Sequence, residues 1–241
     1  MAGHNKWSKI KRDKGVNDAK RGAVFTRIGN MIAMAARGGT DPNMNPALAL
    51  AIEKARQANM PKDNIQRSID RVADKNAAQL EEATYEGYGP GGIGIIVETA
   101  TDNKNRTFPE VRTALTKNGA TMADAGSVMF QFTRKGVIRV AATGEDALLR
   151  VLDAGAEDAA EEDDGLTVYT DMKDLAKVRT AIVDAGLAVD DAELQYVPNN
   201  HIEIADEETA RKIMKILDAL DEVDDVVNVH TNADITIEPN E

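Results

Sequence analysis

Apolar residues in the first third of the chain recur at every third or fourth position, which is the spacing of one helix face. Gly38 and Gly39 end the first such stretch. Asn45 caps the second stretch, Pro46 takes its first helical position, and Asp63 caps the third stretch. We therefore predict three helices, whose inward-facing stripes are formed by Val24, Ile28, Met31, Ile32, Ala35, Leu48, Ile52, Ala55, Ile65, Ile69 and Val72.

Beyond residue 80, short runs of the kind found in strands alternate with helical stretches. A first group is predicted as a strand at 93–101, a helix at 108–119 and a strand at 127–133. Thr107 and Glu110 have the T-x-x-E spacing of a capping box, which predicts the start of this helix. Strand and helix together form one α/β group.

A second group has the order β-α-β-β-α-β, which is that of the ferredoxin-like split βαβ unit. Its six elements are predicted at residues 136–141, 145–155, 156–163, 166–171, 174–186 and 192–198. The remaining chain again supplies a strand, a helix and a strand, predicted at residues 201–205, 206–220 and 223–231. This last group has the elements that the first group lacks.

The patterns predict an α+β fold: an N-terminal basic arm and three-helix domain, followed by two α/β ferredoxin-like domains, one inserted in the other. The arm and the helical domain take residues 1–80. Residues 82–133 plus 198–241 form a split α/β domain, and residues 134–197 form the inserted domain. The alternative is three domains in simple series.

Charge is distributed unevenly along these parts. The 241 residues carry a formal net charge of -12. Residues 1–75 nevertheless hold 15 Lys/Arg against 7 Asp/Glu, a balance of +8, whereas the remainder holds 14 against 34, a balance of -20. This asymmetry favours a basic working end on an acidic body. The competing interpretation, that the basic end only pairs with the acidic body, is weaker because exposed ion pairs contribute only about 0–1 kcal/mol each.

Composition excludes several classes of protein. The chain has no cysteine, so disulfides, thiol catalysis and thiolate zinc sites are ruled out. No apolar run approaches the roughly 20 residues of a membrane span, and no apolar segment follows the basic start as in a secretory signal. We therefore expect a cytoplasmic protein with no membrane partner.

The sequence contains no complete motif for catalysis or for cofactor binding. Gly87, Gly89 and Gly92 spell G-x-G-x-x-G, but they run into a strand rather than a helix, so a tight turn is favoured over a nucleotide site. The three serines lie outside any G-x-S-x-G elbow, and the three histidines are isolated. The acidic run 157–164 lacks the ligand pattern of a calcium loop. We expect no enzyme, no cofactor, no metal and no small-molecule substrate.

The basic half is what remains as a functional surface. Its cations can displace counterions from a phosphate backbone, and a flat side chain among them can stack on an unpaired base. Lys20 and Arg27 are expected to share a helix face away from the apolar stripe, and Arg67 and Arg71 to repeat this on the third helix. The candidate nucleic-acid-binding residues are His4, Lys6, Trp7, Lys9, Lys11, Arg12, Lys14, Lys20, Arg21, Arg27 and Arg37.

Trp7 is the single tryptophan of the chain, and it lies inside the basic arm. One interpretation is that its ring stacks on a base, which suits irregular or single-stranded RNA better than a duplex groove. The other is that the ring folds back and anchors the arm on the helical domain. The two interpretations are compatible, and the sequence does not separate them.

Four stretches closely resemble the YebC family. They are "MAGHNKWSKIKRDKGVNDAKRGAVFTRI", "NPALALAIEKARQANMPKDNIQRSI", "YEGYGPGGIGIIVE" and "DNKNRTFPEVRTALTKNGA". The resemblance runs through the whole chain and is strongest in residues 1–120. "GSVMFQF" departs from it, because a tryptophan is expected after Gly-Ser-Val; Met129 and Phe130 keep the site apolar.

The resemblance implies a three-domain protein that binds nucleic acid or the ribosome and is not itself a catalyst. Bacterial relatives are described as DNA-binding transcriptional regulators, and others are linked to ribosomes slowed at proline-rich stretches. The mitochondrial branch is a translational activator for a cytochrome oxidase subunit. We therefore expect a ribosome-associated translation factor that contacts rRNA or tRNA, with ribosomal proteins as further partners; a DNA-binding transcriptional regulator is the alternative.

Overall fold

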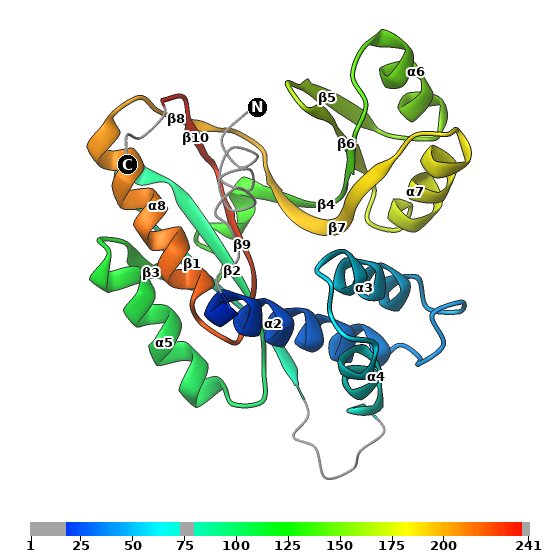
Figure 1. Ribbon diagram of the computed structural model, residues 1–241. Helices are drawn as coiled ribbons and strands as arrows, with labels where there is room; N and C mark the ends of the chain where they lie inside the picture. The colour runs from blue at the N-terminus through cyan, green and yellow to red at the C-terminus, as the bar shows by residue number, and fades with distance from the viewer. Residues whose placement is uncertain (1–17, 73–79, 238–241) are drawn as a thin grey trace. The chain divides into compact units, whose positions relative to one another are not determined.

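The computed structural model describes residues 18–72 and 80–237, which combine helices with largely antiparallel sheets (Figure 1). The predicted α+β class is confirmed. Two compact units divide the chain: residues 1–132 with 198–241 form the larger, and residues 133–197 form the smaller. The N-terminal helices belong to the larger unit.

Helices α2 (Asp18–Ala36), α3 (Pro46–Gln57) and α4 (Lys62–Asp70) share one apolar core. Asn45 joins the end of α2 to the start of α3. Its side chain accepts a hydrogen bond from Leu48 N at 3.1 Å, which caps α3, and donates to the carbonyl oxygens of Ala35 and Gly39 at 2.7 Å. The end of α2 and the start of α3 are therefore held by a single buried amide.

Two details of the predicted helical domain are wrong. Asp63 is not the cap of α4, because Pro61 occupies that position and Asp63 lies in the first turn. Val72 does not face inward: α4 ends at Asp70, and Val72 is 39% exposed. Ile65 and Ile69 do enter the core as expected.

A four-stranded sheet of order β3-β1-β2-β9 forms the centre of the larger unit. Its strands are β1 (Glu81–Tyr88), β2 (Gly94–Thr101), β3 (Thr121–Ala123) and β9 (Val226–Thr231). Helices α5 (Lys104–Lys117) and α8 (Glu207–Asp221) pack against each other and against the apolar side of β2. A short parallel pair, β8 (Ile202–Ile204) with β10 (Ala233–Ile235), completes the unit.

Three expectations for this sheet need correction. Strand β1 lies in a stretch for which no strand is predicted, and it forms because its backbone pairs with β2 over eight residues. Helix α5 begins at Lys104, capped by the Asn103 side chain, so Thr107 is inside the helix and makes no capping box. Residues Met129–Gln131 form a 3-10 turn, and strand β4 begins only at Phe132.

The smaller unit is built on a sheet of order β5-β6-β4-β7, with the first and third strands of the unit at its centre. The apolar side of the sheet is buried with Val151 of α6 and Ile182 of α7. Its elements are β4 (Phe132–Val140), α6 (Glu145–Asp153), β5 (Asp158–Glu162), β6 (Gly165–Thr170), α7 (Leu175–Asp184) and β7 (Val189–Pro198).

Arg27 connects α2 to the sheet of the larger unit. Its guanidinium donates to the carbonyl oxygens of Val226 at 2.8 Å and Asp221 at 2.7 Å, and pairs with the Asp221 carboxylate at 3.3 Å. The Arg27 side chain is only 13% exposed. One cation therefore satisfies the end of α8 and the start of β9 at once.

Asp225 lies beside this contact and is itself buried. Its carboxylate accepts hydrogen bonds from the hydroxyls of Thr101 at 3.0 Å and Thr107 at 2.6 Å, and it pairs with Arg106 at 2.7 Å. These donors come from β2 and α5. The turn between α8 and β9 is thus fixed to a strand and a helix, and Arg27 binds to a rigid target.

A second buried carboxylate holds a surface loop. Glu86 of β1 is 4% exposed and accepts three backbone N–H bonds, from Gly126 and Val128 at 2.6 Å and from Met129 at 2.8 Å. Burial by itself would raise the pKa of Glu86, but the three N–H donors outweigh it and hold that pKa below its ordinary value. We call residues 124–131 the pinned loop.

Replacing Arg27 with Met keeps the length of the side chain but leaves two carbonyl oxygens and the Asp221 carboxylate without their donor. We expect Arg27→Met to lower the free energy of unfolding by about 2–4 kcal/mol, measured by urea denaturation. The matched control is Arg67→Met, since exposed Arg67 bonds only within α4, to the Asp63 carbonyl and the Asn64 side chain. Equal effects of the two variants would contradict the assigned role.

Glu86→Gln tests the pinned loop. Because its pKa is lowered in the folded protein, ionised Glu86 contributes stability above the unfolded pKa of about 4.3, and this contribution is lost as the pH falls through the lower folded pKa. We expect Glu86→Gln to cost about 1.5–3 kcal/mol at pH 7 and to remove this acid-side loss, measured by denaturation between pH 3 and 7. Glu82→Gln, at an exposed position of the same strand, should change neither.

Candidate nucleic-acid interface

The predicted nucleic-acid-binding residues fall into three groups in the structure. Lys20 and Arg21 belong to the first turn of α2, which begins at Asp18. Arg27 and Arg37 lie further along and just beyond the same helix. The others lie outside the described residues: His4, Lys6, Trp7, Lys9, Lys11, Arg12 and Lys14.

Arg27 lies away from the apolar core of α2–α4, as its position in the sequence predicts, but this side of the helix is turned to the sheet and not to solvent. Its donors bond to Val226 and Asp221, as described above. The face of α2 that points away from the core shared with α3 and α4 is not a free surface, because α2 packs on β2 and β9. Arg27 therefore stabilises the fold, and we leave it out of the interface.

Arg37 is exposed but also makes an internal bond. Its guanidinium donates to the carbonyl oxygen of Leu80 at 2.8 Å, just before β1 begins. Arg71, expected on an outward face of the third helix, donates to the Asn30 side chain at 3.3 Å and pairs with Asp102 at 3.6 Å. Both arginines thus link the helical part to the start or end of a strand.

Two exposed cations were missed by the sequence argument. Arg56 lies in the last turn of α3, and Lys62 begins α4. A basic residue at a helix C-terminus is also explained by the helix dipole, so nothing in the sequence singles out Arg56 as a binding residue. Within residues 22–72, they and Arg67 are the exposed cations of helices α2–α4, and we call these three the exposed helical cations.

The cations of residues 1–72 are unevenly distributed, and several of those in residues 22–72 bond within the protein. Residues 1–21 hold 7 Lys/Arg against 2 Asp/Glu, and residues 22–72 hold 7 against 4. Arg27, Arg37 and Arg71 of the second group have partners inside the protein. The highest density of Lys and Arg along residues 1–72 is therefore found in residues 1–21.

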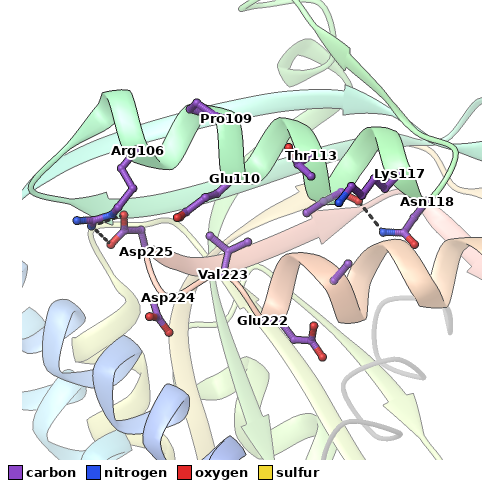
Figure 2. A pocket seen from close by; sticks show the side chains of 12 residues that line it. Arg106, Pro109, Glu110, Thr113, Lys117, Asn118, Glu222, Val223, Asp224 and Asp225 are labelled. Carbon is purple, nitrogen blue, oxygen red and sulfur yellow. Dashed lines mark hydrogen bonds and ion pairs between the residues drawn. The ribbon is translucent and has the colours of Figure 1, made fainter.

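A groove of about 830 Å³ lies between α5 and the end of α8, and offers a different kind of surface (Figure 2). Arg106 and Lys117 are the cations that line it, and Arg106 is paired with Asp225 at 2.7 Å and with Asp102 at 3.1 Å. Among its twelve lining residues there is no serine, histidine or tyrosine. The groove therefore has no serine–histidine pair of the kind that activates a nucleophile.

Within residues 18–72 and 80–237, no group of three or more His, Asp or Glu side chains is placed to hold a metal ion. None of the helices in those ranges combines the length and the apolar character required to cross a membrane. Buried His230 contacts Glu98 at 2.9 Å between neighbouring strands β9 and β2.

Comparison with known proteins identifies relatives along the whole chain. A family model described as "TACO1/YebC protein N-terminal domain" matches residues 5–75, and "TACO1/YebC second and third domain" matches residues 80–233. A protein of Thermobifida fusca named "Probable transcriptional regulatory protein" is 48% identical over 98% of this chain and 96% of its own. One of Chlorobaculum tepidum with the same description is 47% identical over 98% and 96%.

A solved structure shares the fold as well as the sequence. The crystal structure of a conserved hypothetical protein from Aquifex aeolicus aligns with a TM-score of 0.86 and 39% identity, over 92% of this chain and 93% of its own. The resemblance seen in the sequence is thus confirmed over nearly the full length. On these matches, the chain belongs to the TACO1/YebC family.

Proposed function

We propose that this protein is a non-enzymatic regulator of gene expression that binds nucleic acid through residues 1–21 and the exposed helical cations. Its most direct role would be that of a cytoplasmic, ribosome-associated translation factor acting on rRNA or tRNA. The observation that carries the proposal is the distribution of cations. Arg27, Arg37 and Arg71 have internal partners. In residues 1–21, by contrast, Lys and Arg outnumber Asp and Glu by five.

RNA suits this surface for a physical reason. Dense cations on an arm release counterions from phosphates without choosing a sequence, and an aromatic ring among them stacks on unpaired bases. Trp7 and His4 supply such flat side chains beside Lys6 and Lys9. Single-stranded loops and bulges of RNA expose their bases, whereas a duplex groove does not.

The domain arrangement we propose keeps the acidic parts away from the phosphates. Residues 1–80 would be the binding domain, while 82–133 with 198–241 and the inserted 134–197 would stay clear of the nucleic acid or contact proteins. The balance of -20 over residues 76–241 supports this, because like charges repel.

The second candidate is a DNA-binding transcriptional regulator. The names of the Thermobifida and Chlorobaculum relatives favour it. So does the connection between α3 and α4: four residues, 58–61, separate them, and α4 begins with exposed Lys62. Helix-turn-helix proteins use a turn of about this length and read bases with the start of the second helix.

Charge removal in the arm tests the main proposal. We expect replacement of Lys9, Lys11 and Arg12 by Ala to weaken binding to purified ribosomes and to flatten its salt dependence by about 0.7–0.9 for each lost phosphate contact. Cosedimentation over a range of KCl concentrations measures both. Replacement of Lys173, Lys177 and Lys215 by Ala removes the same charge from exposed positions elsewhere and should change neither.

The outcomes separate the two candidates. Failure of the unmodified protein to bind ribosomes at low salt, even on stalled complexes, would contradict the translation role. A gel shift that shows tighter binding to promoter DNA than to random DNA would favour the transcriptional role. Equal and strongly salt-dependent binding to both DNAs would mark DNA binding as non-specific.

Trp7→Ala separates stacking from anchoring. If the ring stacks on a base, we expect weaker binding, by the roughly 1–3 kcal/mol of one stacked base, with an unchanged salt slope. Trp7→Phe should retain much of the affinity. A lower melting temperature with intact affinity would instead assign Trp7 to anchoring the arm.

A further inference from the structure

Three neighbouring segments of the larger unit contain no charged residue. Charged residues make up 29% of the sequence, yet residues 87–92, 125–132 and 198–202 contain no Asp, Glu, Lys or Arg. Hydrogen bonds bring the three segments together: the Tyr88 hydroxyl donates to Ser127 O at 2.6 Å, and Asn199 N donates to Gln131 O at 2.8 Å. We call these three segments the neutral surface.

An exposed aromatic ring stands on this surface. Phe130 is 71% exposed, and Tyr88 is 39% exposed. A single exposed apolar side chain is common on soluble proteins and would not by itself indicate a site. What distinguishes Phe130 is that its backbone is held from several sides.

The loop that carries Phe130 is fixed on both sides of the ring. Glu86 binds the N–H groups of Gly126, Val128 and Met129, and the Asn199 amide donates to Phe130 O at 3.2 Å. A side chain at Gly94 would come within 2.6 Å of Val128, so the loop also packs tightly on bare backbone. A ring presented by a rigid loop loses little entropy on binding.

The chemistry of the neutral surface points to a protein partner. The centres of protein interfaces are poor in charge and rich in aromatic residues and Met, and a few buried aromatic anchors carry most of the affinity. A nucleic-acid site would need cations around the ring, and the three segments have none. Burial also lowers the pKa of His201, which keeps this neighbour uncharged at neutral pH.

We propose that the neutral surface is a docking site for a protein component of the ribosome, in which Phe130 enters an apolar pocket with an uncharged polar rim. This rests on the proposed translation role. The complex would then have two contacts of different physical kind. The arm would supply a salt-dependent contact to RNA, and Phe130 a contact that depends little on salt because it buries apolar area.

Ribosome binding by Phe130→Ala is the first test. We expect affinity for purified ribosomes about 10–100-fold weaker at every KCl concentration, with the salt slope of the unmodified protein retained. Met44→Ala is the matched control, because Met44 is also apolar and is 83% exposed on the loop before α3. An unchanged denaturation midpoint for Phe130→Ala would show that the fold is intact.

Crosslinking identifies what the ring contacts. With p-benzoylphenylalanine in place of Phe130, irradiation of the ribosome complex should give a peptide-to-peptide adduct, found by mass spectrometry. An adduct to a nucleotide would overturn the proposal in favour of base stacking. Unchanged affinity of Phe130→Ala, with the arm variant still weakened, would overturn this inference alone. If the unmodified protein does not bind ribosomes, the translation role and this inference both fail.

Discussion

The contact of Arg27 with the turn between α8 and β9 holds the N-terminal helices against the sheet of the larger unit. The guanidinium reaches two carbonyl oxygens and the Asp221 carboxylate from a helix that lies almost 200 residues earlier in the chain. It can do so because Asp225 ties the same turn to β2 and α5 through Thr101, Thr107 and Arg106. The position of α2, and with it the point from which the basic arm starts, follows from these bonds.

On the proposed function, the same cation chemistry would serve two purposes in this protein. Arginines whose planar groups meet fixed carbonyl oxygens or carboxylates hold the helical part in place. Cations in residues 1–21, where only two acidic residues occur, can neutralise phosphates instead. A third kind of surface, the neutral one around Phe130, carries no charge and is suited to an apolar contact. On our proposals, cations that bind phosphates, cations with internal partners and a surface without charge would have three different roles in the larger unit.

Much of the fold follows from local patterns. The apolar stripes, the Asn45 cap with Pro46 and each single element of the β-α-β-β-α-β order depend on residues that are close together in the sequence, and the structure has these elements. Strand β1 was missed because its acidic and glycine-containing sequence becomes a strand only by pairing with β2. Thr107 was misassigned because its hydroxyl bonds to Asp225, 118 positions away. The dense charge of residues 1–21 is visible in the sequence, but the internal partners of Arg27, Arg37 and Arg71 are not, since each depends on tertiary contacts.

Ultraviolet crosslinking in living cells, followed by sequencing of the nucleic acid attached to residues 1–21, decides most directly what this protein binds. The partition of cations and the aromatic ring in the arm predict fragments of rRNA or tRNA, lost when Lys9, Lys11 and Arg12 are replaced by Ala. Recovery of genomic DNA without RNA, or adducts that persist in this variant, would contradict the proposal that the arm acts on RNA.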